Sequence, residues 1–424
     1  MAESMQAAEV GPSKGGNASR RHARSDARRI AMLLPVLIVF LSVLVGGHWY
    51  LIRRLVLDPG LPEPLSAALV FGIGLMGSTL VLQPIAERTL PARTRRIVAW
   101  PASIWMGLAF LLLMALLLSE MLMLLVAASA QTDSVVLLAA RVRAAGIVGL
   151  VLPTALLALR QGLALPSVKR IELALARWPR ALDGFRIVQI SDIHFGSLRG
   201  ADFARWLVEQ VNRLSPDLVA ITGDLVDGPV SRVLDDVTPL EKLRATHGAF
   251  FVTGNHDHYS GAGSWAERIA ELGIRVLRNE HVTLLQCGAR IEVAGVDDHQ
   301  ARRLPGEEGE DLDSALASVD PDRALILLAH DPSTFKQASK RGVDLQLSGH
   351  THGGQLWPFN FFVKLAVPFV AGIYRRGAAT LYVSRGTGFW GPPMRLRAPA
   401  EITEIVLRTG TGGQASCEPS SSEG

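Results

Sequence analysis

The pattern of hydrophobic positions divides the chain near residue 165. Before this point lie four long apolar stretches, at roughly Ile30–Ile52, Leu65–Ala86, Val98–Ala128 and Ala144–Gly162. Each approaches or exceeds the ~20 residues that a helix needs to cross a bilayer. We therefore expect residues 30–164 to form an all-α, multi-span membrane domain with about four transmembrane helices.

After residue 165, short β-rich runs alternate with amphipathic helical ones. Five apolar runs of strand length predict buried strands, at Phe185–Ile190, Leu218–Thr222, Ala249–Thr253, Ala324–Ala329 and Leu345–Ser348. Between the first two, residues 201–214 place Phe203, Leu207 and Val211 on one helical face. Such alternation predicts a layered α/β domain with a parallel or mixed sheet. We place this domain at 168–408 and expect the Gly/Ser-rich residues 409–424 to be a disordered tail.

The basic residues predict how the chain lies in the membrane. Fifteen Lys and Arg residues fall on the side of the N-terminus, the loop between the second and third stretches, and the segment after the fourth, whereas four fall on the other side. Since basic residues favour the cytoplasmic face, we expect a multi-pass protein of the cell's inner membrane with a basic cytoplasmic segment, 1–29, and a cytoplasmic soluble domain. A twin-arginine export signal would have one short apolar core, not four.

Charge also limits the partners of the soluble domain. Residues 165–424 contain 28 Lys and Arg against 31 Asp and Glu. This part of the chain therefore lacks the basic excess of a nucleic-acid-binding protein, and no nucleic acid or protein partner is expected. The two cysteines of the chain exclude a four-thiolate metal cage.

Polar residues with metal-binding side chains follow all five predicted strands. These residues are Asp192, His194, Asp224, Asn255, His256, Asp257, His330, His350 and His352. In α/β sheets, ligands bind beyond the carboxyl ends of the strands. Each residue alone has an ordinary structural explanation, such as a turn, a helix cap or a core histidine. The motifs Gly-Asn-His-Asp and Gly-His-Thr-His-Gly-Gly are more specific, and the complete ordered set favours a metal site.

This ordered set resembles the calcineurin-like metallophosphoesterase superfamily over about residues 168–408. The stretches Ser-Asp-Ile-His-Phe-Gly, from Ser191, and Leu-Ser-Gly-His-Thr-His-Gly-Gly-Gln, from Leu347, are similar to those of its membrane-associated branch. That branch includes UDP-diacylglucosamine hydrolases and uncharacterised membrane phosphodiesterases. The resemblance implies a four-layer αββα sandwich for the soluble domain and a metal-dependent hydrolase of phosphoric ester or anhydride bonds.

The resemblance also implies roles for the individual residues. It assigns Asp192, His194 and His352 to one divalent metal ion, assigns Asn255, His330 and His350 to a second, and makes Asp224 the bridge between them. A thiolate-free set of His, Asp and Asn suits Mn²⁺, with Fe or Zn²⁺ as alternatives. His256 would donate to a phosphoryl oxygen or protonate the leaving group. Asp257 would orient the ring of His256, or cap a turn.

An apolar segment after the last motif suggests the substrate. Trp357, Phe361 and Phe362 belong to an aromatic, proline-broken stretch, and Arg385 and Arg395 are near enough in sequence to clamp a second phosphate. We interpret this as a groove for a lipophilic phosphate substrate at the bilayer, such as UDP-2,3-diacylglucosamine, and hence a place in lipid metabolism. Alternatively, the segment packs against membrane helices, and the enzyme is a tethered phosphodiesterase or phosphatase for a soluble nucleotide or a phosphoprotein. A non-catalytic membrane scaffold is disfavoured by the complete ligand set.

Overall fold

The computed structural model describes residue 35 and residues 37–129 and 132–410. The predicted basic segment at 1–29, and residues 411–424 of the predicted tail, lie outside the described residues. Internal contacts divide the chain into two compact units, with boundaries after Gly77, Leu122 and Ala144. Residues 78–122 therefore belong to the same unit as the whole soluble domain.

Within the described residues, four helices are long and apolar enough to cross a membrane, which confirms the predicted N-terminal fold class. They are Leu37–Leu57, α2 (Leu65–Thr89), α3 (Ala92–Ser129) and α4 (Asp133–Leu163). The last turn of the first helix, Arg53–Leu57, is π-helical. Helix α3 is longer than predicted from hydropathy alone, because its first turns include the basic residues that follow Ala92.

The soluble domain contains two mixed six-stranded sheets. The first has the order β1-β12-β2-β3-β4-β5, and the second β10-β11-β9-β8-β7-β6. The strands of the first sheet are β1 (Ser167–Leu175), β2 (Arg186–Ile190), β3 (Leu218–Thr222), β4 (Ala249–Val252), β5 (Arg275–Val276) and β12 (Glu401–Thr409). Those of the second are β6 (Glu280–Gln286), β7 (Ala289–Gly295), β8 (Leu325–Leu328), β9 (Leu345–Ser348), β10 (Gly372–Arg376) and β11 (Ala379–Val383).

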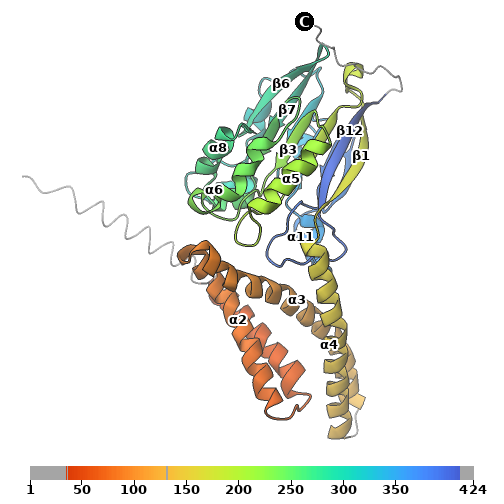
Figure 1. Cartoon of the computed structure of the whole chain (residues 1–424). Helices are drawn as coiled ribbons and strands as arrows, with labels where there is room; N and C mark the ends of the chain where they lie inside the picture. The colour runs from red at the N-terminus through yellow and green to blue at the C-terminus, as the bar shows by residue number, and fades with distance from the viewer. Residues whose placement is uncertain (1–34, 36, 130–131, 411–424) are drawn as a thin grey trace, which may run out of the picture. The chain divides into compact units, whose positions relative to one another are not determined.

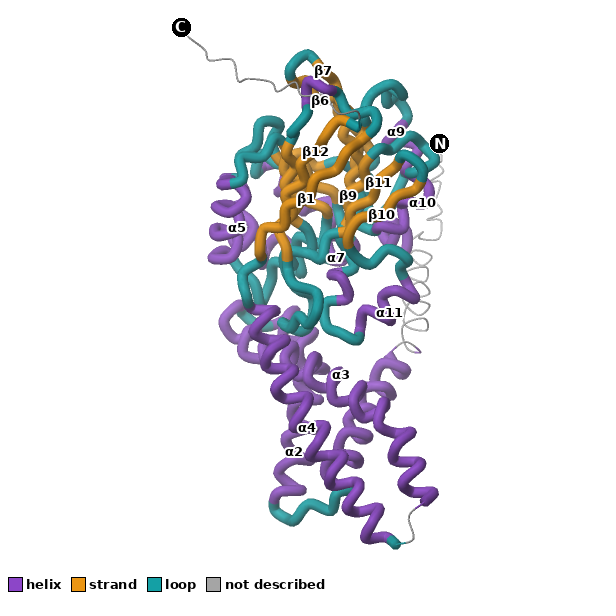
Figure 2. The backbone as a smooth tube through the Cα atoms, turned by 90° about the vertical axis from the view of Figure 1, so that its right-hand side faces the viewer, coloured by secondary structure: helices purple, strands orange, loops and turns teal. Residues whose placement is uncertain are grey.

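The two sheets pack face to face over one apolar core and carry helices on their outer faces (Figures 1 and 2). Ile187 and Val252 of the first sheet meet Ile326 and Leu345 of the second in this core. The first sheet packs outward on α5 (Ala201–Arg213), α6 (Val230–Val237) and α8 (Ala262–Glu271). The second packs on α9 (Leu312–Leu316) and α10 (Phe335–Ala338). The fold is therefore the predicted αββα sandwich.

Parallel pairing brings the candidate site together. Strands β2, β3 and β4 run parallel in the first sheet, and β8 and β9 run parallel in the second. Because the carboxyl ends of parallel strands share one edge of a sheet, the loops after these five strands meet at one end of the sandwich. The loop after β4 continues into the short helix α7 (Asn255–Tyr259). The apolar stretch after the last motif forms a helix, α11 (Phe359–Ala366), none of whose residues is buried.

Candidate metal centre

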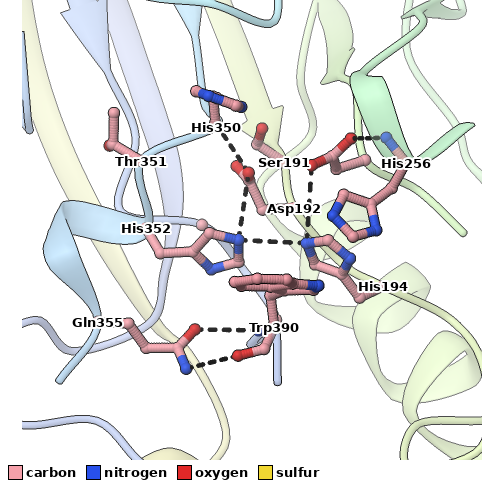
Figure 3. A network of polar contacts seen from close by, with 12 residues as sticks. Ser191, Asp192, His194, His256, His350, Thr351, His352, Gln355 and Trp390 are labelled. Atoms are coloured by element: carbon pink, nitrogen blue, oxygen red, sulfur yellow. Dashed lines mark hydrogen bonds and ion pairs between the residues drawn. The ribbon is translucent and has the colours of Figure 1, made fainter. Parts of the chain in front are cut away.

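The first cluster of potential ligands contains Asp192, His194 and His352, all buried. Their ligand atoms lie within 4.8 Å of one another. Nε2 of His194 is 3.1 Å from Nε2 of His352, and Oδ1 of Asp192 is 3.5 Å from Nε2 of His352 (Figure 3). The second carboxylate oxygen of Asp192, Oδ2, is buried without a hydrogen-bond partner among the described residues. Such an unsatisfied buried oxygen is costly unless a cation binds it.

The second cluster contains Asp224, His330 and His350. The main-chain carbonyl of Thr222 lies 2.8 Å from Nδ1 of His330 and can only accept, so Nδ1 carries the proton. Nε2 of neutral His330 then presents its lone pair to Oδ2 of Asp224 at 3.1 Å and to Nδ1 of His350 at 3.2 Å. Three lone-pair donors facing one another repel unless a proton or a metal ion lies between them.

Asp224 lies between the two clusters. Its Oδ2 is 3.1 Å from His330 and 3.8 Å from Nε2 of His194, while its Oδ1 accepts from the main-chain N–H of His256. Oδ1 of Asn255 is buried without a hydrogen-bond partner in the described part of the chain. Gly254 is required here, because a Cβ atom at that position would lie 2.2 Å from Oδ1 of Asp224. These positions fit a bridging carboxylate beside a neutral amide ligand.

The main chain at the site is strained. Asp192, His194, Asp224, His350 and His352 all have positive φ angles, between 49° and 73°. The left-handed conformation costs a residue with a side chain roughly 1–2 kcal/mol. Strain of this kind persists where the surrounding structure enforces it, and it clusters at functional sites. Five of the ten non-glycine residues with positive φ in the described part of the chain are therefore predicted ligands, which fits a functional site.

The carboxylates at the centre favour a positive charge beside them. Burial alone would raise the pKa of Asp224, but the attraction and hydrogen bond of His330 hold it well below its usual range. Burial alone would lower the pKa of His330, yet the charges of Asp224 and Asp192 raise it well above its usual range. The pair therefore attracts a proton, and a divalent cation satisfies the same carboxylates.

His256 lies beside the clusters, with its side chain partly open to solvent. Nδ1 of His256 is 2.7 Å from Oδ1 of Asp227, and the same oxygen is 3.0 Å from Nδ1 of His194. Burial opposes protonation of His256, but the hydrogen bond to Asp227 and the charge of Asp224 outweigh it and raise its pKa to about 9. The hydrogen bond to Asp227 therefore fixes the ring of His256 and favours its protonated form.

Of the two roles predicted for Asp257, the structure shows the cap of a turn, at the start of α7, and not a hydrogen bond to the ring of His256. Asp257 is fully buried and accepts hydrogen bonds from the main-chain N–H groups of Leu225, Val226 and Gly254. It thus joins the loops after β3 and β4, and burial raises its pKa to about 7. The residue that holds the ring, Asp227, was not among the site residues predicted from the sequence. Its position three residues after Asp224, in the same loop, was the available signal.

The structure separates the predicted aromatic substrate contacts. A cavity of about 700 Å³ opens beside the clusters and is lined by Phe362, but not by Trp357 or Phe361. Trp357 and Phe361 are instead 38% and 58% exposed. Phe359 and Trp390 line the cavity in their place. Helical periodicity explains the difference, because Phe359 and Phe362 share one face of α11 and Phe361 does not.

The two predicted phosphate-clamping arginines point elsewhere. Arg385 pairs with Glu401 at 3.3 Å. Arg395 is completely buried and donates to the main-chain carbonyls of Gly388, Ala398 and Arg385. Burial lowers its pKa to about 10. Neither guanidinium lines the cavity, so the expectation that they clamp a second phosphate does not fit this geometry. Arg395 instead packs beneath His352, 3.4 Å from its Nδ1.

Comparison with known proteins places these residues in a family. The model of the calcineurin-like phosphoesterase family matches residues 185–354. A "transmembrane protein with metallophosphoesterase domain" from Danio rerio is 41% identical over 253 residues, covering 57% of this chain and 57% of that protein. An uncharacterised metallophosphoesterase of Helicobacter pylori is 39% identical over 249 residues, covering 58% of this chain and 65% of its own length. One from Aquifex aeolicus is 33% identical over 247 residues, covering 57% of this chain and 91% of its own length.

The chain thus spans about three fifths of the length of the first two relatives. None of the three names states a substrate, so the predicted kinship with UDP-diacylglucosamine hydrolases stays a prediction. The matched segment contains all seven predicted ligands, and the relative from Aquifex aeolicus is covered almost completely. This membrane-associated chain belongs to the calcineurin-like metallophosphoesterase family.

Proposed function

We propose that the protein is a membrane-anchored two-metal hydrolase of a lipid-linked phosphodiester or pyrophosphate, such as UDP-2,3-diacylglucosamine. The observation that carries this proposal is the cavity of about 700 Å³ beside the candidate metal centre. At one end it is lined by His194, Asp224, Asn255, His256, His350 and His352. Elsewhere its lining is mostly apolar, as an amphiphilic substrate requires.

Much of the apolar lining comes from two helices. Helix α11 contributes Phe359, Phe362 and Val363, and membrane helix α3 contributes Met106 and Phe110. The rings of Phe110 and Phe359 contact each other edge to face, with centroids 5.8 Å apart. A phosphate at the metal centre would thus have an apolar wall, partly built by a transmembrane helix, directly beside it. A lipid chain fits that wall better than a nucleotide does.

The donor set fits two divalent cations. Asp192, His194 and His352 would hold one, Asn255, His330 and His350 the other, with Asp224 between them, and we propose Mn²⁺ because nitrogen and oxygen donors are mixed. Such cations neutralise the charge of the phosphate and acidify the attacking water. His256 lines the cavity, and its Asp227-held ring would give a proton to the leaving oxygen as the phosphorus–oxygen bond breaks.

The distribution of basic residues supports a cytoplasmic catalytic domain. A reporter that is active only in the cytoplasm, fused after Arg408, should be active, and one that is active only outside should be silent. The reverse pattern would place the chemistry on the outer face of the membrane.

A substrate comparison tests the function. Full-length protein in detergent with Mn²⁺ should hydrolyse a lipid-linked pyrophosphate with a lower KM than a small chromogenic phosphodiester, and chelation should abolish both activities. Preference for soluble nucleotides or phosphopeptides would favour the tethered alternative. A protein that binds two metal ions yet hydrolyses nothing in the panel would favour the scaffold.

A further inference from the structure

We propose that a second cavity holds the polar arm of the substrate and that Arg95 binds an anionic group on that arm. The inference rests on the proposed hydrolysis of a lipid-linked phosphate and adds the chemical class of the polar arm. This cavity has a volume of about 690 Å³ and is lined by loops and by helices α6 and α7 of the soluble domain, and by residues of α2 and α3.

The two cavities meet at the reacting groups. His256 and Tyr259 line both of them, and Asp227, which holds the ring of His256, lines the second. A substrate with its phosphate at the metal centre can therefore extend in two directions. One direction is apolar, along α11 and α3, and the other is lined by charged residues that include Arg88, Arg95 and Arg232. The bond that breaks would then join a lipid arm to a hydrophilic arm, with His256 at the junction.

Arg95 is a buried cation of the second cavity whose nearest carboxylate is distant. Its side chain is only 7% exposed, and its Nε is buried without a hydrogen-bond partner in the described part of the chain. The nearest carboxylate, Glu87, is 4.0 Å away, and its Oε2 already accepts from Ser197 at 2.6 Å. A buried cation with so distant a partner is costly. An anion entering the cavity would supply the missing charge-assisted hydrogen bonds.

The other charged groups of the cavity favour an anion of phosphate type. Arg88 is exposed at its rim, and Arg232 donates to the main-chain carbonyls of Glu87 and Arg88, which fixes the end of α2 to the start of α6. The carboxylates of the cavity are Glu87 and Asp227. Glu87 accepts a hydrogen bond from Ser197, and Asp227 is hydrogen-bonded to two histidines. Arginine binds phosphate in a forked geometry. We therefore infer that the polar arm bears a second phosphate, as in a pyrophosphate-linked lipid.

This assignment replaces the predicted clamp of Arg385 and Arg395, whose guanidinium groups are engaged within the soluble domain. The second phosphate would instead be bound by a residue at the start of a membrane helix. Arg95 lies in the basic stretch that the sequence explains by membrane orientation alone, so the sequence offered no separate reason to select it.

The test compares Arg95→Gln with Arg93→Gln, a matched control that removes one charge from an exposed residue in the same turn of α3. Each full-length variant is assayed on two lipids with identical acyl chains, cytidine diphosphate diacylglycerol and phosphatidylmethanol. Loss of a buried arginine–phosphate contact should raise the KM of Arg95→Gln about tenfold for the diphosphate lipid. Its KM for the methyl ester should stay within about twofold, since that arm has no second phosphate. Arg93→Gln should match the wild type on both lipids.

A binding measurement separates this inference from the proposed function. Calorimetric titration of ADP and AMP into the same three proteins with Mn²⁺ requires no turnover. Arg95→Gln should weaken ADP about tenfold and leave AMP within about twofold. Equal weakening of both nucleotides, or of neither, would overturn the assignment of Arg95. If ADP binding discriminates as expected while neither lipid is hydrolysed, the anionic subsite stands and the lipid substrate fails.

Discussion

The loops that carry the candidate ligands differ from helix α11, which follows the last of these loops in the sequence. The ligand loops are buried and strained, with Asp192 and His330 at most 1% exposed and five residues in the left-handed conformation. Helix α11 has no buried residue, and its Leu365 side chain is 87% exposed. Exposure of so large an apolar side chain to water is unfavourable, and clustered exposed apolar residues mark interaction sites. Contacts within the soluble domain hold the ligand loops in place, whereas α11 leaves apolar side chains such as Phe361 and Leu365 exposed.

This difference separates two tasks. Buried carboxylates and imidazoles held at fixed distances suit a reaction centre that must be organised before the substrate arrives. An exposed apolar helix suits contact with a lipid or a bilayer surface, where shape varies and burial supplies the free energy. Substitutions in the loops should therefore change metal content and turnover, and substitutions in α11 should change only the recognition of lipophilic substrates.

The largest effect is expected for Asp224→Asn, because Asp224 faces both clusters. Replacing one of its oxygens with an amide NH₂ group removes a ligand atom and places N–H donors against His330. Activity should fall by more than about 10³-fold, beyond the usual loss from a single polar group. Elemental analysis should show fewer than two metal ions per chain. A fully active variant, or two retained ions, would contradict the bridging role.

His256→Ala should have the next largest effect. His256 lines both cavities but belongs to neither group of proposed ligands, so both metal ions should remain while kcat falls by roughly 10²–10⁴-fold. Metal analysis alongside steady-state kinetics tests this division of roles. If the variant loses a metal ion, His256 is itself a ligand and the second cluster needs redefining.

The sequence predicted the scaffold of the site better than its details. The five buried strands and the ordered motifs at their ends were readable because hydrophobic runs and strand-end polar residues are local signals. The partner of His256 was not, since Asp227 and Asp257 are both acidic residues close to it, and only the folded chain shows which one turns toward the ring. The engagement of Arg395 with carbonyls of its own loop likewise depends on tertiary contacts that no spacing encodes.

Asp227→Asn and Asp257→Asn should separate these two acidic residues by mechanism. Asp227 holds the rings of His194 and His256, so Asp227→Asn should lower kcat by about 10–100-fold with little change in melting temperature. Asp257 accepts three main-chain hydrogen bonds, and an amide NH₂ would face at least one N–H group. Asp257→Asn should therefore lower the melting temperature by several degrees. Thermal unfolding and kcat measurements on both variants test this. If Asp257→Asn instead lowers kcat and Asp227→Asn lowers only the melting temperature, Asp257 is the residue that orients His256.

The smallest effect is expected in α11, where the chain offers its own control. Phe359 and Phe362 line the cavity, whereas Phe361, 58% exposed on the same helix, does not. Replacing Phe359 and Phe362 with Ser should raise KM for a lipid-linked pyrophosphate about tenfold. Both rings are partly exposed, so an apolar arm would cover only part of each, and loss of contact equivalent to about two buried CH₂ groups, at ~0.8 kcal/mol each, changes KM by this amount. Hydrolysis of a small chromogenic diester should be unchanged, since that substrate needs only the metal centre. Phe361→Ser should leave both substrates unaffected. Equal losses of activity on both substrates would mean that α11 supports the fold of the site. No loss of activity on either substrate would show that the apolar wall has no role in recognition, and the ligand loops alone would then account for the chemistry.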